Sequence, residues 1–233
     1  MTGDATIKVA TWNVHSFIGR DGVSSVGRVA AVLREIDADL VALQEVQSSL
    51  DPEPDALAFL AEQTRGRAIA GMTVMRRDAP YGNVLFTRWP VVQVRRHDLS
   101  VPGREPRGAI DVDLDLSGRR LQLIATHLGL LPSERRRQVD RLLPVLRVPD
   151  DHLVILTGDL NEWFLWGRPL RVLRRLFPDM PRRRSFPAHF PLLSLDRVWV
   201  HPRHALVRLA VHASSLARVA SDHLPVVATV VTR

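Results

Sequence analysis

The chain has 233 residues, 45% of them hydrophobic and 24% charged, which is typical of a globular protein and excludes collagen-like repeats and chain-wide disorder. It has no cysteine, which excludes disulfides, thiolate nucleophiles and cysteine-ligated zinc or iron–sulfur centres. The net charge is +7, and 31 of the 32 cationic residues are arginine, which indicates either a phosphate-bearing partner or a bias of the genome toward arginine codons.

Short apolar, β-branched runs recur along the chain, each bounded by Gly, Pro, Asp or Asn. Their lengths and boundaries predict ten strands. These are Ile7–Trp12, Leu40–Leu43, Val84–Phe86, Val91–Val94, Ala109–Leu116, Leu121–Thr126, Leu153–Leu156, Val198–Val200, Leu206–Val211 and Val226–Val230. The turn residues Ser117 and Gly118 predict a hairpin between the fifth and sixth of them.

Apolar residues at helical spacing predict four helices, Val26–Ile36, Asp55–Thr64, Ser133–Leu146 and Arg168–Phe177, with Ser133 as an N-cap. No linker or repeat interrupts the chain. Many strands with a few helices between them predict a single α+β domain over residues 1–233, with two packed sheets and helices outside. We expect no signal peptide, no membrane span and a cytoplasmic location, because no long apolar run occurs.

Polar residues stand at the ends of six predicted strands. In chain order they are Asn13, Gln44-Glu45, His127, Gly158-Asp159-Leu160-Asn161, Asp196 and Ser221-Asp222-His223. One such residue alone is usually a turn residue, a helix cap or a structural histidine. Six in order indicate a site, since the loops at strand ends converge in layered folds.

This ordered set resembles the endonuclease/exonuclease/phosphatase superfamily, the deoxyribonuclease-I-like metal-dependent phosphoesterases. The resemblance extends from Thr11 to Val226. It implies a four-layer α/β/β/α sandwich with mainly antiparallel sheets. It also implies that Glu45, Asn13 and Asp222 bind Mg²⁺ or Mn²⁺, a hard cation that can neutralise charge on a transferring phosphoryl group.

The catalytic roles also follow from the resemblance. His223 would be the general base or would orient the attacking water, and Asp196 would fix its tautomer. Asp159 and Asn161 would lie close to the phosphate, one orienting water or donating a proton and the other stabilising the oxyanion. His127 would contact the scissile phosphate or protonate its leaving oxygen.

The segment around His127 distinguishes branches of the superfamily. It is similar to the deoxyribonuclease, sphingomyelinase and deadenylase side, whereas the tyrosine segment of abasic-site endonucleases is missing. Deoxyribonuclease I supports this histidine with a glutamate, but the matching segment here offers Asn83. Arg107 resembles a family arginine, and Asn83 and Arg107 are predicted to bind the substrate phosphate, with a solvated loop arginine as the alternative for Arg107.

The positive charge is concentrated in the second half of the chain. Residues 1–116 carry a net −3, and residues 117–233 carry +10. The runs Arg135–Arg137, Arg174-Arg175 and Arg182–Arg184 could follow a nucleic-acid backbone or form solvated faces. The apolar segment Glu162–Gly167 could stack on bases, enter a lipid interface or pack internally, and we expect it to be partly exposed.

These features predict a monomeric, metal-dependent phosphodiester hydrolase with a phosphate-bearing substrate. A nuclease acting on DNA or RNA is favoured. The alternatives are a phospholipid or sphingomyelin-type phosphodiesterase at a membrane surface and, in a different class, a non-catalytic nucleic-acid or membrane-binding module.

Overall fold

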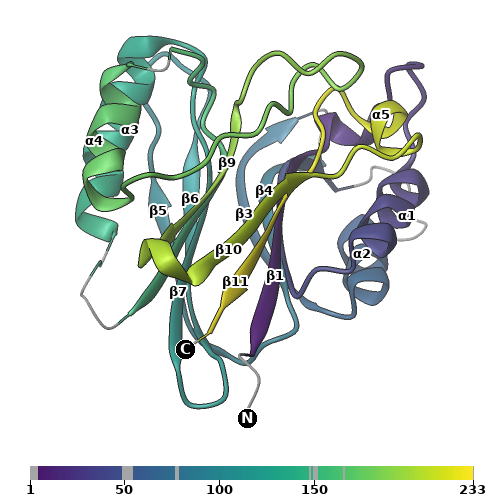
Figure 1. Ribbon diagram of the computed structural model, residues 1–233. Helices are drawn as coiled ribbons and strands as arrows, with labels where there is room; N and C mark the ends of the chain where they lie inside the picture. Colours follow the sequence, from purple (N-terminus) through teal and green to yellow (C-terminus); the bar gives the residue numbers. More distant parts are fainter. Residues whose placement is uncertain are drawn as a thin grey trace.

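The computed structural model describes residues 5–48, 55–76, 79–146, 148, 152–164 and 166–232. Two β-sheets pack face to face, and helices cover the outer face of each (Figure 1). No helix within these ranges is long and apolar enough to cross a membrane. The expectation of an α/β/β/α sandwich is therefore confirmed.

The first sheet has six strands and the second has five. Across the first sheet the order is β10 (Leu206–Val211), β11 (Val226–Val231), β1 (Thr6–Asn13), β2 (Leu40–Gln47), β4 (Ala79–Thr87) and β3 (Arg67–Arg76). Across the second it is β5 (Val91–Asp98), β6 (Gly108–Asp115), β7 (Arg120–His127), β8 (Leu153–Asp159) and β9 (Asp196–His201). Neighbours are antiparallel except for one parallel pair in each sheet, β1 with β2 and β7 with β8.

Helices lie on both outer faces of the sandwich. The helices α1 (Val26–Ile36), α2 (Ala56–Thr64) and α5 (Ala217–Ala220) cover the first sheet, and α3 (Pro132–Leu142) and α4 (Arg168–Leu176) cover the second (Figure 1). Three short 3₁₀ turns, His15–Phe17, Leu143–Val145 and Arg203–Ala205, complete the described elements.

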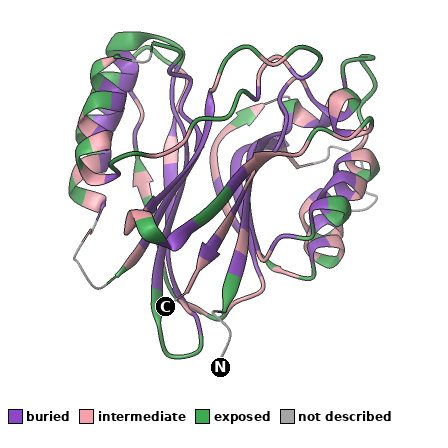
Figure 2. Cartoon of the chain, viewed as in Figure 1, coloured by how far each residue is buried: buried purple, intermediate pink, exposed green. Residues whose placement is uncertain are grey.

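The alternation of side chains along each strand produces three apolar layers. On β9, Val198 and Val200 face the layer between the sheets, where they are buried with Val9 of β1. Trp199 points the other way and packs on Phe177 beneath α4, with ring centroids 5.9 Å apart. Figure 2 shows this pattern as buried strands with exposed residues on the outer helix faces and end loops.

Two local predictions were incomplete. The strand β3 was not predicted, because its sequence contains Gly71 and lacks a sustained β-branched run, and pairing with β4 supplies its hydrogen bonds. Ser133 is not the N-cap of α3, since the helix begins at Pro132 with Leu131 as its N-cap. Proline is preorganised for the first helical position, and this preference outweighs the serine signal.

Candidate active site

The carboxyl ends of the two parallel strand pairs meet at one end of the sandwich. β1 ends at Asn13, which is in register with Gln44 of β2, and β7 ends at His127, which is in register with Asp159 of β8. The two pairs belong to different sheets. Even so, Asn13 Nδ2 donates a hydrogen bond to Asp159 Oδ2 at 3.2 Å, so the polar residues of both sheets share one site.

The antiparallel partners of these pairs bring the remaining residues to the same end. Asp196 begins β9 directly opposite Asp159. β11 runs antiparallel to β1, so the segment 221–223 that precedes it also lies here. Trp12 Nε1 donates to the backbone oxygen of His223 at 2.9 Å, which ties this segment to the core. The topology therefore gathers residues that are far apart in the sequence.

Glu45 reaches the site through a local distortion of β2. Its φ is +57°, and the pairing of β2 with β4 shifts register between Leu43 and Val46. A bulge of this kind turns a side chain away from the regular alternation. Glu45 consequently accepts a hydrogen bond from Asn13 Nδ2 at 2.9 Å, with its side chain 21% exposed.

Other residues of this end share the left-handed conformation. His15 has a φ of +46°, and Asn161 has one of +51°. Left-handed backbone is costly for residues other than glycine and collects at functional sites, where the surrounding structure enforces it. Positive φ also occurs elsewhere, as at the helix C-caps Asp37 and Arg65, so at this end it serves to set the direction of the Glu45, His15 and Asn161 side chains.

Gly158 allows β7 and β8 to approach closely behind the site. Its φ is +136°, and a Cβ at this position would lie 1.8 Å from the backbone oxygen of Thr126. Only glycine fits there, so the glycine of the Gly-Asp-Leu-Asn motif has a structural reason. The close approach sets His127 and Asp159 side by side.

Asp159 lies at the centre of the site and is 1% exposed. Its Oδ1 accepts from the backbone nitrogen of Asn161 at 2.9 Å. Its Oδ2 lies 3.7 Å from His127 Nε2 and 3.8 Å from His223 Nε2. Burial, and then the nearby Asp196 carboxylate, raise the pKa of Asp159 to about 6.

His223 is held by Asp196 on the far side of its ring. His223 Nδ1 donates to Asp196 Oδ2 at 2.9 Å, and Ser185 Oγ donates to the same oxygen. Burial acts to lower the pKa of His223, but the attraction of Asp196 and this hydrogen bond outweigh it and raise that pKa to about 10. The imidazole is therefore positively charged at neutral pH, with Nε2–H facing Asp159.

His127 is buried and neutral. Burial, followed by the charge of Arg107, lowers the pKa of His127 well below its usual value of 6.5. A guanidinium can only donate, so the contact of 3.1 Å from Arg107 makes His127 Nδ1 an acceptor and leaves the ring proton on Nε2. His127 Nε2 lies 3.1 Å from Asn161 Nδ2, which also donates to the backbone oxygen of Leu128 at 2.9 Å, so N–H groups of both residues lie side by side in the site.

The remaining predicted residues lie around this centre. Asn83 Nδ2 donates to the backbone oxygen of Gly108 at 3.2 Å, and the partner of His127 Nδ1 is Arg107 rather than Asn83. Arg107 is 8% exposed and its Nε lacks a hydrogen-bond partner among the described residues. It is thus a buried cation at the site, not a solvated loop arginine.

His15 is a residue of this end that the sequence analysis missed. Its Nδ1 lies 3.7 Å from Glu45 Oε2 and 3.9 Å from Asp222 Oδ1, and its side chain is 48% exposed. His15, Glu45 and Arg76 help to line a mouth cavity of about 380 Å³. The feature of the sequence that could have identified His15 is its position two residues after Asn13, at the end of the first strand.

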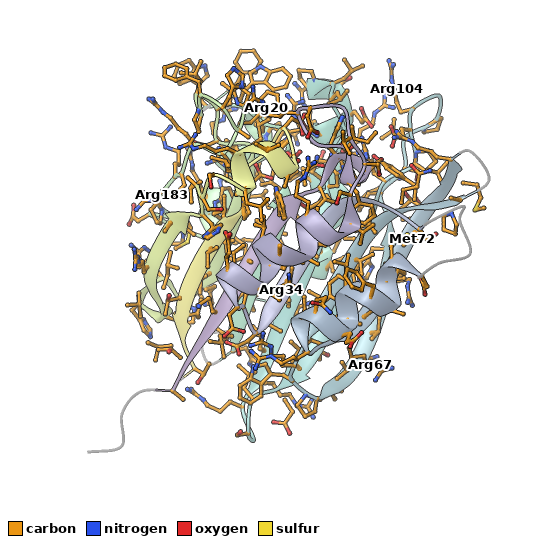
Figure 3. All side chains as sticks on the ribbon, turned by 90° about the vertical axis from the view of Figure 1, so that its right-hand side faces the viewer. Arg20, Arg34, Arg67, Met72, Arg104 and Arg183 are labelled. Carbon is orange, nitrogen blue, oxygen red and sulfur yellow. The ribbon has the colours of Figure 1, made fainter. Side chains whose placement is uncertain are left out.

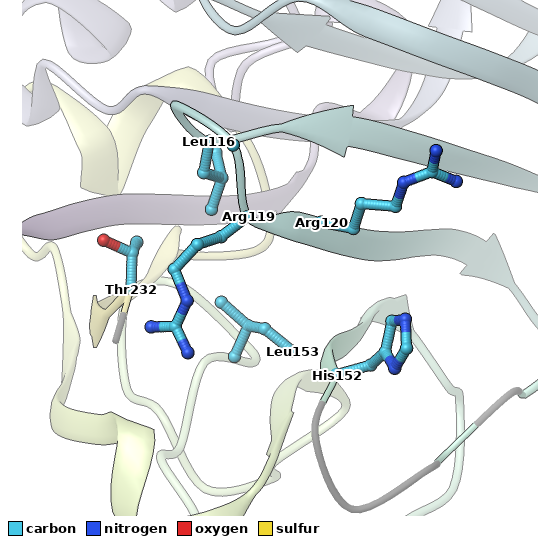
Figure 4. Close-up of a pocket in the computed structure, with 7 residues that line it drawn as sticks. Leu116, Arg119, Arg120, His152, Leu153 and Thr232 are labelled. Atoms are coloured by element: carbon cyan, nitrogen blue, oxygen red, sulfur yellow. The ribbon is translucent and has the colours of Figure 1, made fainter.

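Two other cavities are separate from this mouth. One of about 250 Å³ lies between the edges of the sheets and includes Arg107 in its wall. The other, of about 270 Å³, lies at the opposite end of the sandwich, where Arg119, Arg120 and His152 surround it (Figure 4). The catalytic candidates do not line the latter, which excludes it as part of this site.

Comparison with known proteins agrees with this geometry. The profile described as "Endonuclease/Exonuclease/phosphatase family" matches residues 10–223. The chain belongs to this family. It is 29% identical over 248 residues to "Uncharacterized protein YbhP" of Escherichia coli, and the alignment covers 98% of each chain.

Solved structures of the endonuclease/exonuclease/phosphatase family have the same fold. A protein of this family from Beutenbergia cavernae is 26% identical, with a TM-score of 0.78 over 97% of this chain and 72% of that one. TDP2 of D. rerio complexed with single-strand DNA product is 19% identical, with a TM-score of 0.72 over 97% of this chain and 99% of that one. The family includes metal-dependent phosphoesterases.

The site offers a donor set that suits a hard cation. The carboxylates of Glu45 and Asp222 are 21% and 39% exposed and both face His15. Asn13 lies beside Glu45, and its Oδ1, which accepts from His15 N at 3.0 Å, would have to turn toward a cation to bind it. Mg²⁺ prefers one or two carboxylates and keeps several waters, which this open mouth permits. Asp159, Asp196 and His223 also lie within 4.8 Å of one another, but a cation there would break the Asp196–His223 hydrogen bond.

Proposed function

We propose that this protein is a divalent-metal-dependent phosphodiester hydrolase that uses water as the nucleophile. The observation that carries the proposal is the convergence on Asp159. Its buried carboxylate stands among N–H groups of Asn13, His127 and His223, beside the exposed carboxylate of Glu45. Phosphoryl transfer needs a base, donors for the phosphate oxygens and relief of negative charge, and these residues can supply all three.

Asp159 is the residue we assign as the base. A catalytic base works best when its pKa lies near the operating pH, and the Asp159 pKa of about 6 meets this condition. The pKa of His223 is raised by Asp196 against the effect of burial, which favours the protonated ring at neutral pH. Its role is instead to donate from Nε2 to a phosphate oxygen or to the attacking water, with Asp196 holding the ring.

Neutral His127 and Asn161 are assigned to the phosphate. Both present N–H groups to one place, and an oxygen bearing developing negative charge would accept from them. Arg107 keeps His127 in the tautomer with the proton on Nε2. Asn83 is assigned a supporting role through the Gly108 backbone.

Glu45, Asn13 and Asp222 would hold Mg²⁺ or Mn²⁺. The cation would supply charge neutralisation on the phosphate. Glu45 is partly solvent-exposed, so a substrate can approach it through the mouth. The backbone strain at Glu45 fixes the direction of the carboxylate before the substrate binds.

Nucleic acid is the first substrate candidate. The net +10 of residues 117–233 supports it, because phosphate backbones bind to clustered cations. The TDP2 structure with DNA product has the same fold, which supports the same class of substrate. If nucleic acid is the substrate, the proposed activity is that of a nuclease.

A phospholipid is the second candidate, and a specific observation favours it. Trp163, Phe164 and Trp166 are 39%, 47% and 74% exposed directly after Asn161. Large apolar side chains exposed beside a site that binds phosphate suit a lipid surface.

A metal-dependent assay with bis(p-nitrophenyl) phosphate tests the chemistry without assuming a substrate. We expect hydrolysis with Mg²⁺ or Mn²⁺ and none after EDTA. Asp159→Asn and His223→Gln should each lower kcat by about a thousandfold or more. Asp115→Asn, at the opposite end of the sandwich, should leave the rate unchanged.

A panel of plasmid, single-stranded DNA, RNA and phospholipid vesicles then identifies the substrate class. Full activity of Asp159→Asn would refute the mechanism. Salt-sensitive binding without turnover in any metal would instead support a non-catalytic binding module. The single domain over residues 1–233, the monomer and the cytoplasmic location remain predictions, and gel filtration tests the monomer.

A further inference from the structure

Exposed apolar side chains are concentrated at the end of the sandwich that carries the site. Of the thirteen large hydrophobic residues that are exposed in the described part of the chain, eight lie in three segments there. We call these eight residues the apolar rim: Leu130, Leu131, Trp163, Phe164, Trp166, Phe190, Leu192 and Leu193. In Figure 3, side chains with rings project beyond the ribbon at the upper end, where Arg20 is labelled.

The three segments of the apolar rim begin or end at catalytic candidates. The first follows His127, the second follows Asn161, and the third precedes Asp196. They are joined at their bases, because Leu128 N donates to Asp159 O at 3.0 Å and Leu160 N donates to Leu195 O at 3.1 Å. The rim therefore lies beside the site, at the end of the second sheet.

The first two segments are held rigidly from below. Arg135 of α3 is fully buried and forms two contacts of 3.2 Å with the buried carboxylate of Glu162. It also donates to the backbone oxygens of Gly129 and Leu130. Its guanidinium lies 5.0 Å from the centre of the Trp163 ring. The buried Arg135–Glu162 ion pair thus holds the two segments in a position that leaves the side chains of Leu130 and Trp163 exposed.

The third segment is held by its own turn. Leu193 N donates to Phe186 O at 2.8 Å, and Phe186 N donates back to Leu193 O at 3.1 Å. Arg218 of α5 donates to the backbone oxygen of Ala188 at 3.0 Å. Phe190 is left 65% exposed at the tip of a braced turn.

The exposed charge around the rim is mainly positive. Within residues 128–140 and 160–195, where described, the exposed acids are Asp140 and Asp179, and Asp140 pairs with Arg168 at 3.3 Å. The exposed arginines next to the rim segments in the sequence are Arg136, Arg137, Arg168, Arg171 and Arg184, whereas Arg183 lies well below the upper end in Figure 3. Glu134 and Glu162 are buried. An apolar surface flanked by cations is complementary to a layer of anionic headgroups over hydrocarbon.

The composition of the rim favours a bilayer over nucleic acid. Single-stranded nucleic acid stacks its bases on aromatic rings. Half of the rim residues are leucines, which have no ring face for stacking. Leucine, phenylalanine and tryptophan together are the side chains that enter the boundary between headgroups and acyl chains.

We propose that the apolar rim is a docking surface for an anionic phospholipid bilayer, which would bring the phosphate of the second substrate candidate, a phospholipid, to the site. The docking itself does not depend on catalysis, whereas the assignment of a lipid as substrate rests on the proposed phosphodiester hydrolase. The backbone that carries Leu130 and Phe190 is already braced by hydrogen bonds, so docking does not have to order these two turns.

Co-sedimentation of the full chain with vesicles in EDTA tests the docking. We expect binding to vesicles that contain phosphatidylglycerol and weaker binding to phosphatidylcholine alone, with salt reducing the difference. Trp166→Ser and Leu192→Ser should each lower the partition constant about tenfold. Val207→Ser is the matched control, because Val207 is 62% exposed on β10 and lies outside the rim.

Quenching of tryptophan fluorescence by brominated lipids gives a second measurement. We expect quenching in the native chain and less in Trp166→Phe, which keeps an apolar ring. No binding to anionic vesicles, or an equal loss in Val207→Ser, would overturn the proposal. Loss of single-stranded DNA binding by the rim variants with vesicle binding intact would instead identify the rim as a base-stacking surface.

The two proposals fail in distinguishable ways. Asp159→Asn should still bind vesicles in EDTA, because the docking needs no chemistry. Vesicle binding without hydrolysis of bis(p-nitrophenyl) phosphate in Mg²⁺ would contradict only the proposed function. Hydrolysis of that substrate without vesicle binding would contradict only the docking surface.

Discussion

Replacing Asp196 with asparagine should flatten the pH dependence of stability in metal-free protein between about pH 7 and pH 9.5. In the native chain, burial acts to lower the pKa of His223, but Asp196, followed by Asp159 and Asp222, raises it from 6.5 to about 10, and the variant removes the largest of these raising contributions. A group whose pKa is raised by folding contributes stability that is fully present below its unfolded pKa. That contribution is lost as the pH rises through the folded pKa.

The size of the effect follows from these two pKa values. A shift of one pKa unit corresponds to about 1.4 kcal/mol. At about pH 7 most of the stability that follows from the raised pKa of His223 is present, and at about pH 9.5 little of it remains. The free energy of unfolding of the native protein should therefore fall by about 3 kcal/mol over this interval because of His223. Asp159, with a pKa of about 6, is already ionised throughout the interval and adds no slope.

Urea unfolding in EDTA at several pH values measures the difference. The amide oxygen introduced by Asp196→Asn can still accept from His223 Nδ1, so the ring keeps its hydrogen bond while the carboxylate charge is removed. Removing the Asp196 charge lowers the pKa of Asp159, which stays ionised over this interval in both proteins, and the remaining titrating groups cancel when the two slopes are subtracted. Equal slopes for the native protein and the variant would refute the reasoning, as would an NMR titration that places the His223 pKa at its ordinary value.

Three further predictions concern buried groups near the site. Arg135→Met should lower the free energy of unfolding in urea by about 3–5 kcal/mol, because it leaves the buried carboxylate of Glu162 without its cationic partner. The further change Glu162→Leu should recover most of the loss, and a cost below about 1 kcal/mol for Arg135→Met would contradict this. Gly158→Ala places a Cβ 1.8 Å from the backbone oxygen of Thr126 and should lower the free energy of unfolding by about 3 kcal/mol or more. A melting temperature equal to that of the native protein would contradict this, because it would show that β7 and β8 can move apart at no cost. Arg107→Met should raise the pKa of His127, because the guanidinium charge lowers it, and should reduce kcat/KM at least about tenfold; an unchanged imidazole titration would disprove the link.

The sequence by itself determined the kind of protein. Polar residues after apolar strands are visible in a sequence because strand ends change composition abruptly, and six of them in a fixed order identified the family. The strand and helix periods likewise predicted the two sheets and the helices outside them. These features depend on local spacing, which the chain carries residue by residue.

Only the tertiary structure decided which side chains share an environment. The run Arg135–Arg137 looks uniform in the sequence, but Arg135 is fully buried on Glu162 while Arg136 and Arg137 are exposed, because one helix face packs on the sheet. The contact of Arg107 with His127 spans 20 residues of chain, and no periodicity announces it. The pKa values at the site depend on such contacts and on burial, which exist only after the two sheets have packed.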